Sequence, residues 1–208
     1  MQIKVCGITS FTQLKQLEDL NADFSGLIFY PLSKRYVSGH LEHDQQNIRG
    51  LQIKKIGVFV NQTQAVIEKA ITDYGLYAVQ LHGDETVEFC KELMNKAMVI
   101  KVFRLAESNN IDALIAPFME ACHYFLFDTD TEGYGGSGKK FNWEQIQYAS
   151  INKPFFLSGG IGAGDVASIR SFHHPYLFAI DVNSCFETEP GVKDMQMVDS
   201  FIKTMKNG

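Results

Sequence analysis

The chain has 208 residues, 45% of them hydrophobic, with a formal net charge of -5 and a pI near 5.7. This length can bury one sizeable core, so residues 1–208 are interpreted as a single domain. The negative balance excludes a broad basic surface of the kind that attracts nucleic acid or anionic membranes, and an anionic small molecule would need a local site.

Short β-like runs and amphipathic helical segments alternate from end to end, with no linker or charge block between them. The expected strands are Ile3 to Cys6, Ser25 to Phe29, Lys55 to Val60, Ala78 to Leu81, Val99 to Phe103, Tyr124 to Phe127, Phe155 to Leu157 and Phe178 to Asp181. The helical segments include FTQLKQLEDL, TQAVIEKAITDY, TVEFCKELMNK, NWEQIQYA, DVASIRSF and MQMVDSFIKTMK. This rhythm predicts an α/β fold, a compact (β/α)8 TIM barrel, whose second unit has a weak helix in LEHDQQNIRG.

Neither a membrane span nor a secretion signal is evident. The first residues, MQIKVCGITS, lack a long apolar core with a cleavage site, and no run of about 18 apolar residues occurs. The cysteines at positions 6, 90, 122 and 185 show no CxxC pair and no metal-ligand spacing. We therefore expect a cytoplasmic protein with free thiols, without structural zinc or disulfides.

Candidate site residues follow from position, because chemistry in such barrels lies at the carboxyl ends of the strands. Cys6 ends the first apolar run, and its thiol could serve as a base if the site stabilises the thiolate. Taken without the other candidates, Cys6 is also interpretable as a small core residue. Asp128 follows YFLF, where a partly desolvated carboxyl could act as a general acid or could brace the next loop.

Two further polar residues could contact a ligand at the same end. Arg35, in YPLSKRYVS, could bind a carboxylate through two parallel hydrogen bonds, or could simply be solvated. His82, in VQLHG, could reach a ligand or could bond to a neighbouring strand end.

Two glycine-rich segments are candidates for ligand contact. In LSGGIGAGDV, the backbone N–H groups at Gly159 and Gly160 could cradle a phosphate together with AIDVNS after the last strand, or could only make tight turns. The segment TEGYGGSGKKFNW lacks Walker A spacing, and it could be a lid or an exposed connector.

Seven segments in this order and spacing resemble the phosphoribosylanthranilate isomerase family: KVCGIT, GLIFYPLSKRYVS, KKIGVFVN, AVQLHGDE, LFDTDTEGYGGSGKKFNW, PFFLSGGI and AIDVNSCFETEPGVKD. The resemblance spans nearly the whole chain. It implies an aldose–ketose isomerase of tryptophan biosynthesis, an intramolecular oxidoreductase without metal or organic cofactor, which rearranges N-(5-phosphoribosyl)anthranilate to 1-(o-carboxyphenylamino)-1-deoxyribulose 5-phosphate.

The resemblance also implies roles for individual residues. Asp128 is similar to the general acid that protonates the ribose ring oxygen, Cys6 to the base that takes the proton from ribose C2, and Arg35 to the residue that holds the anthranilate carboxylate. His82 is an expected pocket residue. The segments expected at the phosphate contain Gly159, Gly160, Asp181, Asn183 and Ser184.

The sequence departs from the family pattern in two places, and two alternative functions stay open. Cys185 stands where the family more often has glycine, and SGGIGAGDV is unusually rich in glycine.

The histidine-pathway isomerase performs the same type of rearrangement on a substrate with two phosphates, but it uses two aspartates where this chain has Cys6 and Asp128. A noncatalytic phosphosugar-binding barrel is the other alternative. The expected partner is a small-molecule phosphosugar–anthranilate substrate, not nucleic acid or membrane, and the sequence leaves monomer and homodimer open.

Overall fold

Strands and helices alternate along the residues that the structure, a computed structural model, describes: 1–106, 110–129 and 143–207. The barrel strands are β1 (Gln2–Val5), β2 (Phe24–Ile28), β3 (Lys54–Phe59), β4 (Ala78–Leu81), β5 (Met98–Leu105), β6 (Tyr124–Thr129), β7 (Phe155–Leu157) and β8 (Leu177–Val182). The helices are α1 (Phe11–Asp19), α2 (Gln45–Gly50), α3 (Gln64–Tyr74), α4 (Val87–Met94), α5 (Ile111–Ile115), α6 (Glu144–Gln147), α7 (Val166–Ser171) and α8 (Met195–Lys206).

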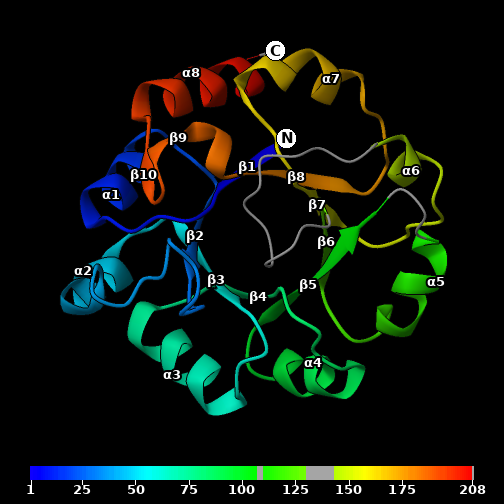
Figure 1. Ribbon diagram of the computed structural model, residues 1–208, viewed down its shortest axis with the longest axis horizontal. Helices are drawn as coiled ribbons and strands as arrows, with labels where there is room; N and C mark the ends of the chain where they lie inside the picture. The colour runs from blue at the N-terminus through cyan, green and yellow to red at the C-terminus, as the bar shows by residue number, and fades with distance from the viewer. Residues whose placement is uncertain (107–109, 130–142, 208) are drawn as a thin grey trace.

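The strands form a closed parallel barrel with the helices around it (Figure 1). Each strand pairs with the next in chain order, and β8 pairs with β1 in a register that sets Lys4 opposite Asp181. The predicted TIM barrel is confirmed, and all eight predicted strands lie within two residues of their observed ends. The weak second helix is real but short: α2 has six residues.

Side chains of each strand alternate between the helices and the barrel interior, as the two-residue period of a strand requires. On β1, Ile3 and Val5 belong to the large core between strands and helices, whereas Cys6 packs with Ile28 and Val58 in a separate interior cluster. Lys4 lies between Ile3 and Val5, so it shares the inward face with Cys6. The alternation therefore directs a buried lysine and a buried cysteine into the barrel.

Helix α8 completes the outer ring between α7 and α1 (Figure 1). Its first N–H groups are capped by Asp194, whose Oδ1 accepts hydrogen bonds from Gln196 N (3.1 Å) and Met197 N (3.0 Å). At its other end, Lys206 Nζ lies 2.9 Å from Asp23 Oδ2 in the loop before β2. The last helix thus ties the end of the chain to the first βα unit.

A short hairpin that the sequence did not predict follows β8. It pairs β9 (Glu187–Glu189) with β10 (Val192–Lys193) in an antiparallel manner. It is fastened to the loop and helix after β1, because Thr9 Oγ1 donates to Gly191 O (2.8 Å) and Gln13 Nε2 donates to Lys193 O (2.9 Å). The hairpin brings Glu187 and Lys193 to the carboxyl end of β1.

Among the residues that the structure describes, no helix has the length and apolar character needed to cross a membrane. In the same part of the chain, no three His, Cys, Asp or Glu side chains gather in an arrangement that could hold a metal ion.

Gly26 provides the space that Cys6 occupies. A Cβ at this position would lie 2.5 Å from Cys6 Sγ and 2.9 Å from Cys6 Cα, closer than such atoms can approach. We expect Gly26→Ala to lower the free energy of unfolding by about 1–3 kcal/mol, measured by urea denaturation, because the overlap forces the strands apart. Gly50→Ala is the matched control, since an added Cβ there meets no atom within 4 Å. Equal urea midpoints for the two variants would contradict the steric argument.

Candidate active site

Cys6 sits at the carboxyl end of β1, almost completely buried. Its side chain is inside the barrel mouth with 4% of the residue exposed, and its N–H donates to Val182 O on β8 at 2.8 Å. The chain then turns at Gly7, whose φ of +76° suits glycine, and whose N–H donates to Gly26 O at 3.0 Å. The backbone that carries the thiol is therefore held by both strands that flank β1.

A buried ion pair lies beside Cys6 in the barrel interior. Lys4 Nζ is 2.8 Å from Asp181 Oδ2, and the two side chains are 0% and 5% exposed. Burial lowers the pKa of Lys4, but the charges of Asp181 and Cys6 outweigh it, so the pKa of Lys4 is raised overall. Burial raises the pKa of Asp181, and Lys4 opposes this shift. The Lys4 ammonium thus stays charged inside the barrel.

The thiol of Cys6 experiences opposing influences. Burial raises the pKa of Cys6, the charge of Lys4 lowers it, that of Asp181 raises it, and Lys193 lowers it. Burial prevails, so the pKa of the Cys6 thiol lies above its ordinary value. A base role for this thiol therefore depends on the cations around it.

Asp128 on β6 and His82, the residue directly after β4, lie together at the mouth. His82 Nε2 is 3.4 Å from Asp128 Oδ2, and both residues are buried. Asp128 Oδ1 also accepts a hydrogen bond from Thr129 N at 2.9 Å, and His82 Nδ1 lies 3.3 Å from Gln80 Nε2. The expected acid is thus held on one side by a backbone N–H and faced on the other by an imidazole.

Arg35 is bound by Glu187 from the hairpin after β8. Arg35 Nε donates to Glu187 Oε1 (2.8 Å), and Arg35 Nη2 donates to Oε2 (2.6 Å). Lys193 Nζ is 2.6 Å from the same Glu187 and donates to Asn183 Oδ1 at 2.8 Å. Burial raises the pKa of Glu187, but the two cations outweigh it and lower the pKa overall. The guanidinium is fixed in direction, and no described residue accepts a hydrogen bond from its Nη1 atom.

The loops after β7 and β8 meet where a phosphate is expected. Gly159 and Gly160 have φ of +95° and +63°, and Cys185 Sγ donates to Gly160 O at 3.5 Å, which joins the two loops. Within the described chain, the backbone N–H groups of Gly159, Gly160 and Ser184 have no acceptor. Three donors are therefore left for a ligand.

Nearly the whole chain matches a known family. The family model for N-(5'-phosphoribosyl)anthranilate isomerase matches residues 3–204. The chain belongs to this family. The isomerase of Phocaeicola vulgatus is 41% identical over 207 residues, which cover 99% of this chain and 98% of that protein.

Solved isomerases of the family share the fold. Monomers generated from the dimeric phosphoribosylanthranilate isomerase of Thermotoga maritima are 30% identical, with a TM-score of 0.82 and full coverage of both chains. A phosphoribosylanthranilate isomerase in complex with reduced 1-(o-carboxyphenylamino)-1-deoxyribulose 5-phosphate is 31% identical, with a TM-score of 0.83 and full coverage of both.

Several predicted positions of the isomerase site can be located. Cys6, His82 and Asp128 all lie at the barrel mouth, and His82 approaches Asp128 directly. Asp181 is in the segment expected at the phosphate, but its carboxylate points inward to Lys4, and Asn183 accepts from Lys193. Residues 131–142 of TEGYGGSGKKFNW, the segment that could be a lid or an exposed connector, lie outside the described residues.

Sequence reasoning missed the charged partners of the isomerase site. Lys4, Glu187 and Lys193 were not singled out, although a lysine inside the apolar run of β1 was a visible signal. Charged residues are rarely fully buried unless they are paired, so Lys4 called for an acidic partner inside the barrel. No comparable signal marked Glu187 or Lys193, because the hairpin that carries them has no strong strand pattern.

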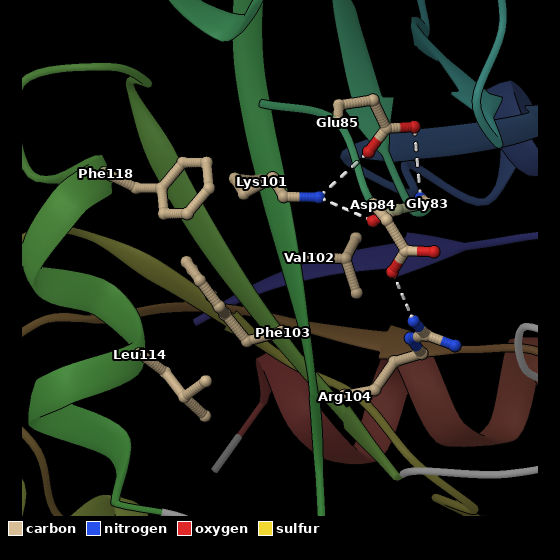
Figure 2. Close-up of a pocket in the computed structure, with 9 residues that line it drawn as sticks. All are labelled: Gly83, Asp84, Glu85, Lys101, Val102, Phe103, Arg104, Leu114 and Phe118. Carbon is tan, nitrogen blue, oxygen red and sulfur yellow. Dashed lines mark hydrogen bonds and ion pairs between the residues drawn. The ribbon is translucent and has the colours of Figure 1, made fainter. Parts of the chain in front are cut away.

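A pocket lies between the loop after β4, strand β5 and the segment from Leu114 of α5 to Phe118 (Figure 2). Lys101 Nζ points into the loop after β4, where it donates to Gly83 O (2.7 Å) and to Glu85 Oε2 (2.8 Å). Glu85 Oε1 in turn accepts from Gly83 N (3.1 Å) and Asn61 N (2.9 Å). The Lys101–Glu85 pair therefore braces the loop that follows His82.

We expect Lys101→Met to lower the free energy of unfolding by about 3–5 kcal/mol, because it leaves the buried Glu85 carboxylate without its cation. Urea denaturation would measure the change. Lys69→Met is the control, since Lys69 forms an exposed pair with Asp73 on α3, and it should leave the urea midpoint unchanged. An equal effect of both substitutions would contradict the bracing role of Lys101.

Proposed function

We propose that the protein catalyses the Amadori rearrangement of N-(5-phosphoribosyl)anthranilate to 1-(o-carboxyphenylamino)-1-deoxyribulose 5-phosphate in tryptophan biosynthesis. The observation that carries the proposal is the pair of buried groups at the barrel mouth, Cys6 on β1 and Asp128 on β6, in a chain of this family. The complex of a related isomerase with the reduced product supports the substrate class, a small phosphosugar joined to anthranilate.

The acid of the proposal is Asp128. Its protonated carboxyl gives a proton to the ribose ring oxygen, the C1–O bond breaks, and the nitrogen lone pair forms a Schiff base at C1. The hydrogen bond from Thr129 N to Asp128 Oδ1 leaves Oδ2 as the oxygen that faces His82 and the mouth. A fixed carboxyl of this kind can meet the ring oxygen without reorganisation.

The base of the proposal is Cys6. Its thiolate takes the proton from ribose C2, the electron pair moves toward the Schiff base nitrogen, and the resulting enolamine tautomerises to the ketone. Hydrogen is moved within one molecule, so atoms and electrons balance without an external oxidant or reductant. These reaction steps require two groups: an acid that protonates the ring oxygen and a base that removes the proton from C2.

The two ends of the substrate are assigned to the remaining residues. Arg35, whose direction Glu187 fixes, binds the anthranilate carboxylate through the guanidinium edge that carries Nη1. The free N–H groups of Gly159, Gly160 and Ser184 bind the phosphate. Binding at both ends would hold the ribose between acid and base.

Cys6→Ala and Asp128→Asn should each lower kcat by about 100- to 10,000-fold, the usual contribution of a positioned acid or base, while substrate still binds. The assay is turnover of freshly generated phosphoribosylanthranilate without added metal. Cys90→Ala is the matched control, because Cys90 is buried in α4 and burial raises its pKa to about 11. Wild-type kcat in either site variant would remove that residue from the mechanism.

Rescue of growth separates the proposal from its rivals. The chain should restore growth without tryptophan in a strain that lacks this isomerase, and it should not rescue a strain that lacks the histidine-pathway isomerase. Rescue of the second strain alone would support the two-phosphate substrate. Tight binding of phosphoribosylanthranilate without turnover would support a noncatalytic binding barrel.

Arg35→Lys should raise KM by about 10- to 100-fold, since a lysine cannot reproduce the two-pronged hydrogen bond to a carboxylate. Steady-state kinetics would separate this rise in KM from any change in kcat. Lys34→Met is the control, because Lys34 is exposed beside Arg35 and should leave both constants unchanged. An unaltered KM in Arg35→Lys would exclude Arg35 from carboxylate binding.

A homodimer is the assembly we propose, on the likeness to the Thermotoga maritima enzyme, which is described as dimeric. Light scattering after gel filtration gives the mass directly. A mass near that of one 23.4 kDa chain would overturn the dimer and leave the proposed activity untouched.

A further inference from the structure

The thiol of Cys6 is surrounded by charged groups from three other parts of the chain as well as its own strand. Lys4 lies on β1, Asp181 on β8, Lys193 on β10 and Arg35 in the loop after β2. Each of these groups interacts electrostatically with Cys6. The three cations, Lys4, Lys193 and Arg35, differ in which other anion binds them.

Arg35 and Lys193 form ion pairs with Glu187. Both bind Glu187, at 2.6 Å in each case, and Lys193 Nζ also donates to the side chain and the carbonyl of Asn183. Burial lowers the pKa of Lys193 and Glu187 only partly compensates, so its pKa is lowered overall. These two cations form a cluster with Glu187.

Lys4 differs from them in its position. It precedes Cys6 by two residues on the same strand, so both side chains project into the barrel. Its side chain is fully buried, and its hydrogen bond to Asp181 Oδ2, 2.8 Å long, holds the ammonium in the interior. The register of β1 with β8, which sets Lys4 directly opposite Asp181, fixes this arrangement in the backbone.

Stability alone does not explain a lysine at this place. Removing two charges from water costs several kcal/mol per ion, and a buried ion pair can often be replaced by apolar side chains without loss of stability. The neighbouring interior layer is apolar, with Phe24, Ile56 and Ala179 among its members. An apolar pair at positions 4 and 181 would continue that layer.

We propose that Lys4 is a positioning residue of the isomerase, whose buried ammonium, held by Asp181, stabilises the Cys6 thiolate that accepts the proton from the substrate. This inference rests on the base role of Cys6 proposed above. Asp181 keeps the ammonium charged and directed inward, and the ammonium supplies the positive charge that stabilises a buried thiolate. In agreement with this geometry, Lys4 lowers the pKa of Cys6 against the effect of burial.

The test replaces the pair as a unit. Lys4→Met/Asp181→Leu removes both charges together, so neither partner is left buried and unpaired, and we expect the fold to be retained. In a chain whose other three cysteines are alanine, the Cys6 thiolate is followed without turnover as the difference in 240 nm absorbance against pH from the same chain with Cys6→Ala, because this subtraction removes the absorbance of the eight tyrosines. We expect the thiol titration to move at least about one pH unit upward, a tenfold loss of thiolate on its acid side.

Kinetics give a second readout. The acid limb of the kcat/KM profile should move upward with the thiol, whereas KM should change little, since Lys4 does not touch the expected substrate ends. Lys4→Arg keeps the charge and should restore the position of the limb. Lys55→Met is the matched control, because Lys55 is also buried but its Nζ donates to Leu51 O, away from Cys6.

The outcomes are distinguishable. Because Asp181 acts on the thiol in the opposite direction to Lys4, Lys4→Gln is titrated beside the double variant, and an unchanged thiol titration in both would overturn the role of Lys4, whatever the kinetics show. A titration that moves as expected, in a protein whose turnover survives Cys6→Ala, would keep the electrostatic link and overturn the base role instead. If the double variant does not fold, Lys4→Gln with the same two readouts decides the matter in the same way.

Discussion

The pairing of β1 with β8 is the constraint on which the rest of the molecule depends. It closes the barrel, and it also sets Lys4 against Asp181 inside it. Because the eight barrel strands run in the same direction, closure gathers all their carboxyl ends in one ring. The pairing of β1 with β8 therefore closes the barrel and also places the Lys4–Asp181 ion pair below its mouth.

Charge inside this barrel is organised in pairs and small clusters. Lys4 meets Asp181 in the interior, Lys101 meets Glu85 under the loop after β4, and Glu187 joins two cations beside β1. Each arrangement holds a loop or a side chain that lies close to the proposed chemistry. Ion pairs of this kind add little net stability to a core, but they restrict where a polar group can point.

The fold was predictable from the sequence because its signals are local. Apolar runs with turn residues between them located all eight strands to within two residues, and position at the ends of those runs selected Cys6, His82 and Asp128. Partners were not predictable, since Arg35 and Glu187 are 152 residues apart and their contact depends on how the hairpin after β8 folds back. Asp181 was selected for its segment, whereas the direction of its side chain follows from strand register.

Glu187 has a consequence for how this cluster can change over time. The Glu187 carboxylate binds both Arg35 and Lys193. Loss of either cation leaves Glu187 paired with the other cation alone, which changes the net charge of the cluster. A substitution at one of these positions therefore alters the selective value of substitutions at the other two. Descendants of this sequence would be expected to inherit the trio together, or to exchange it only through compensating replacements.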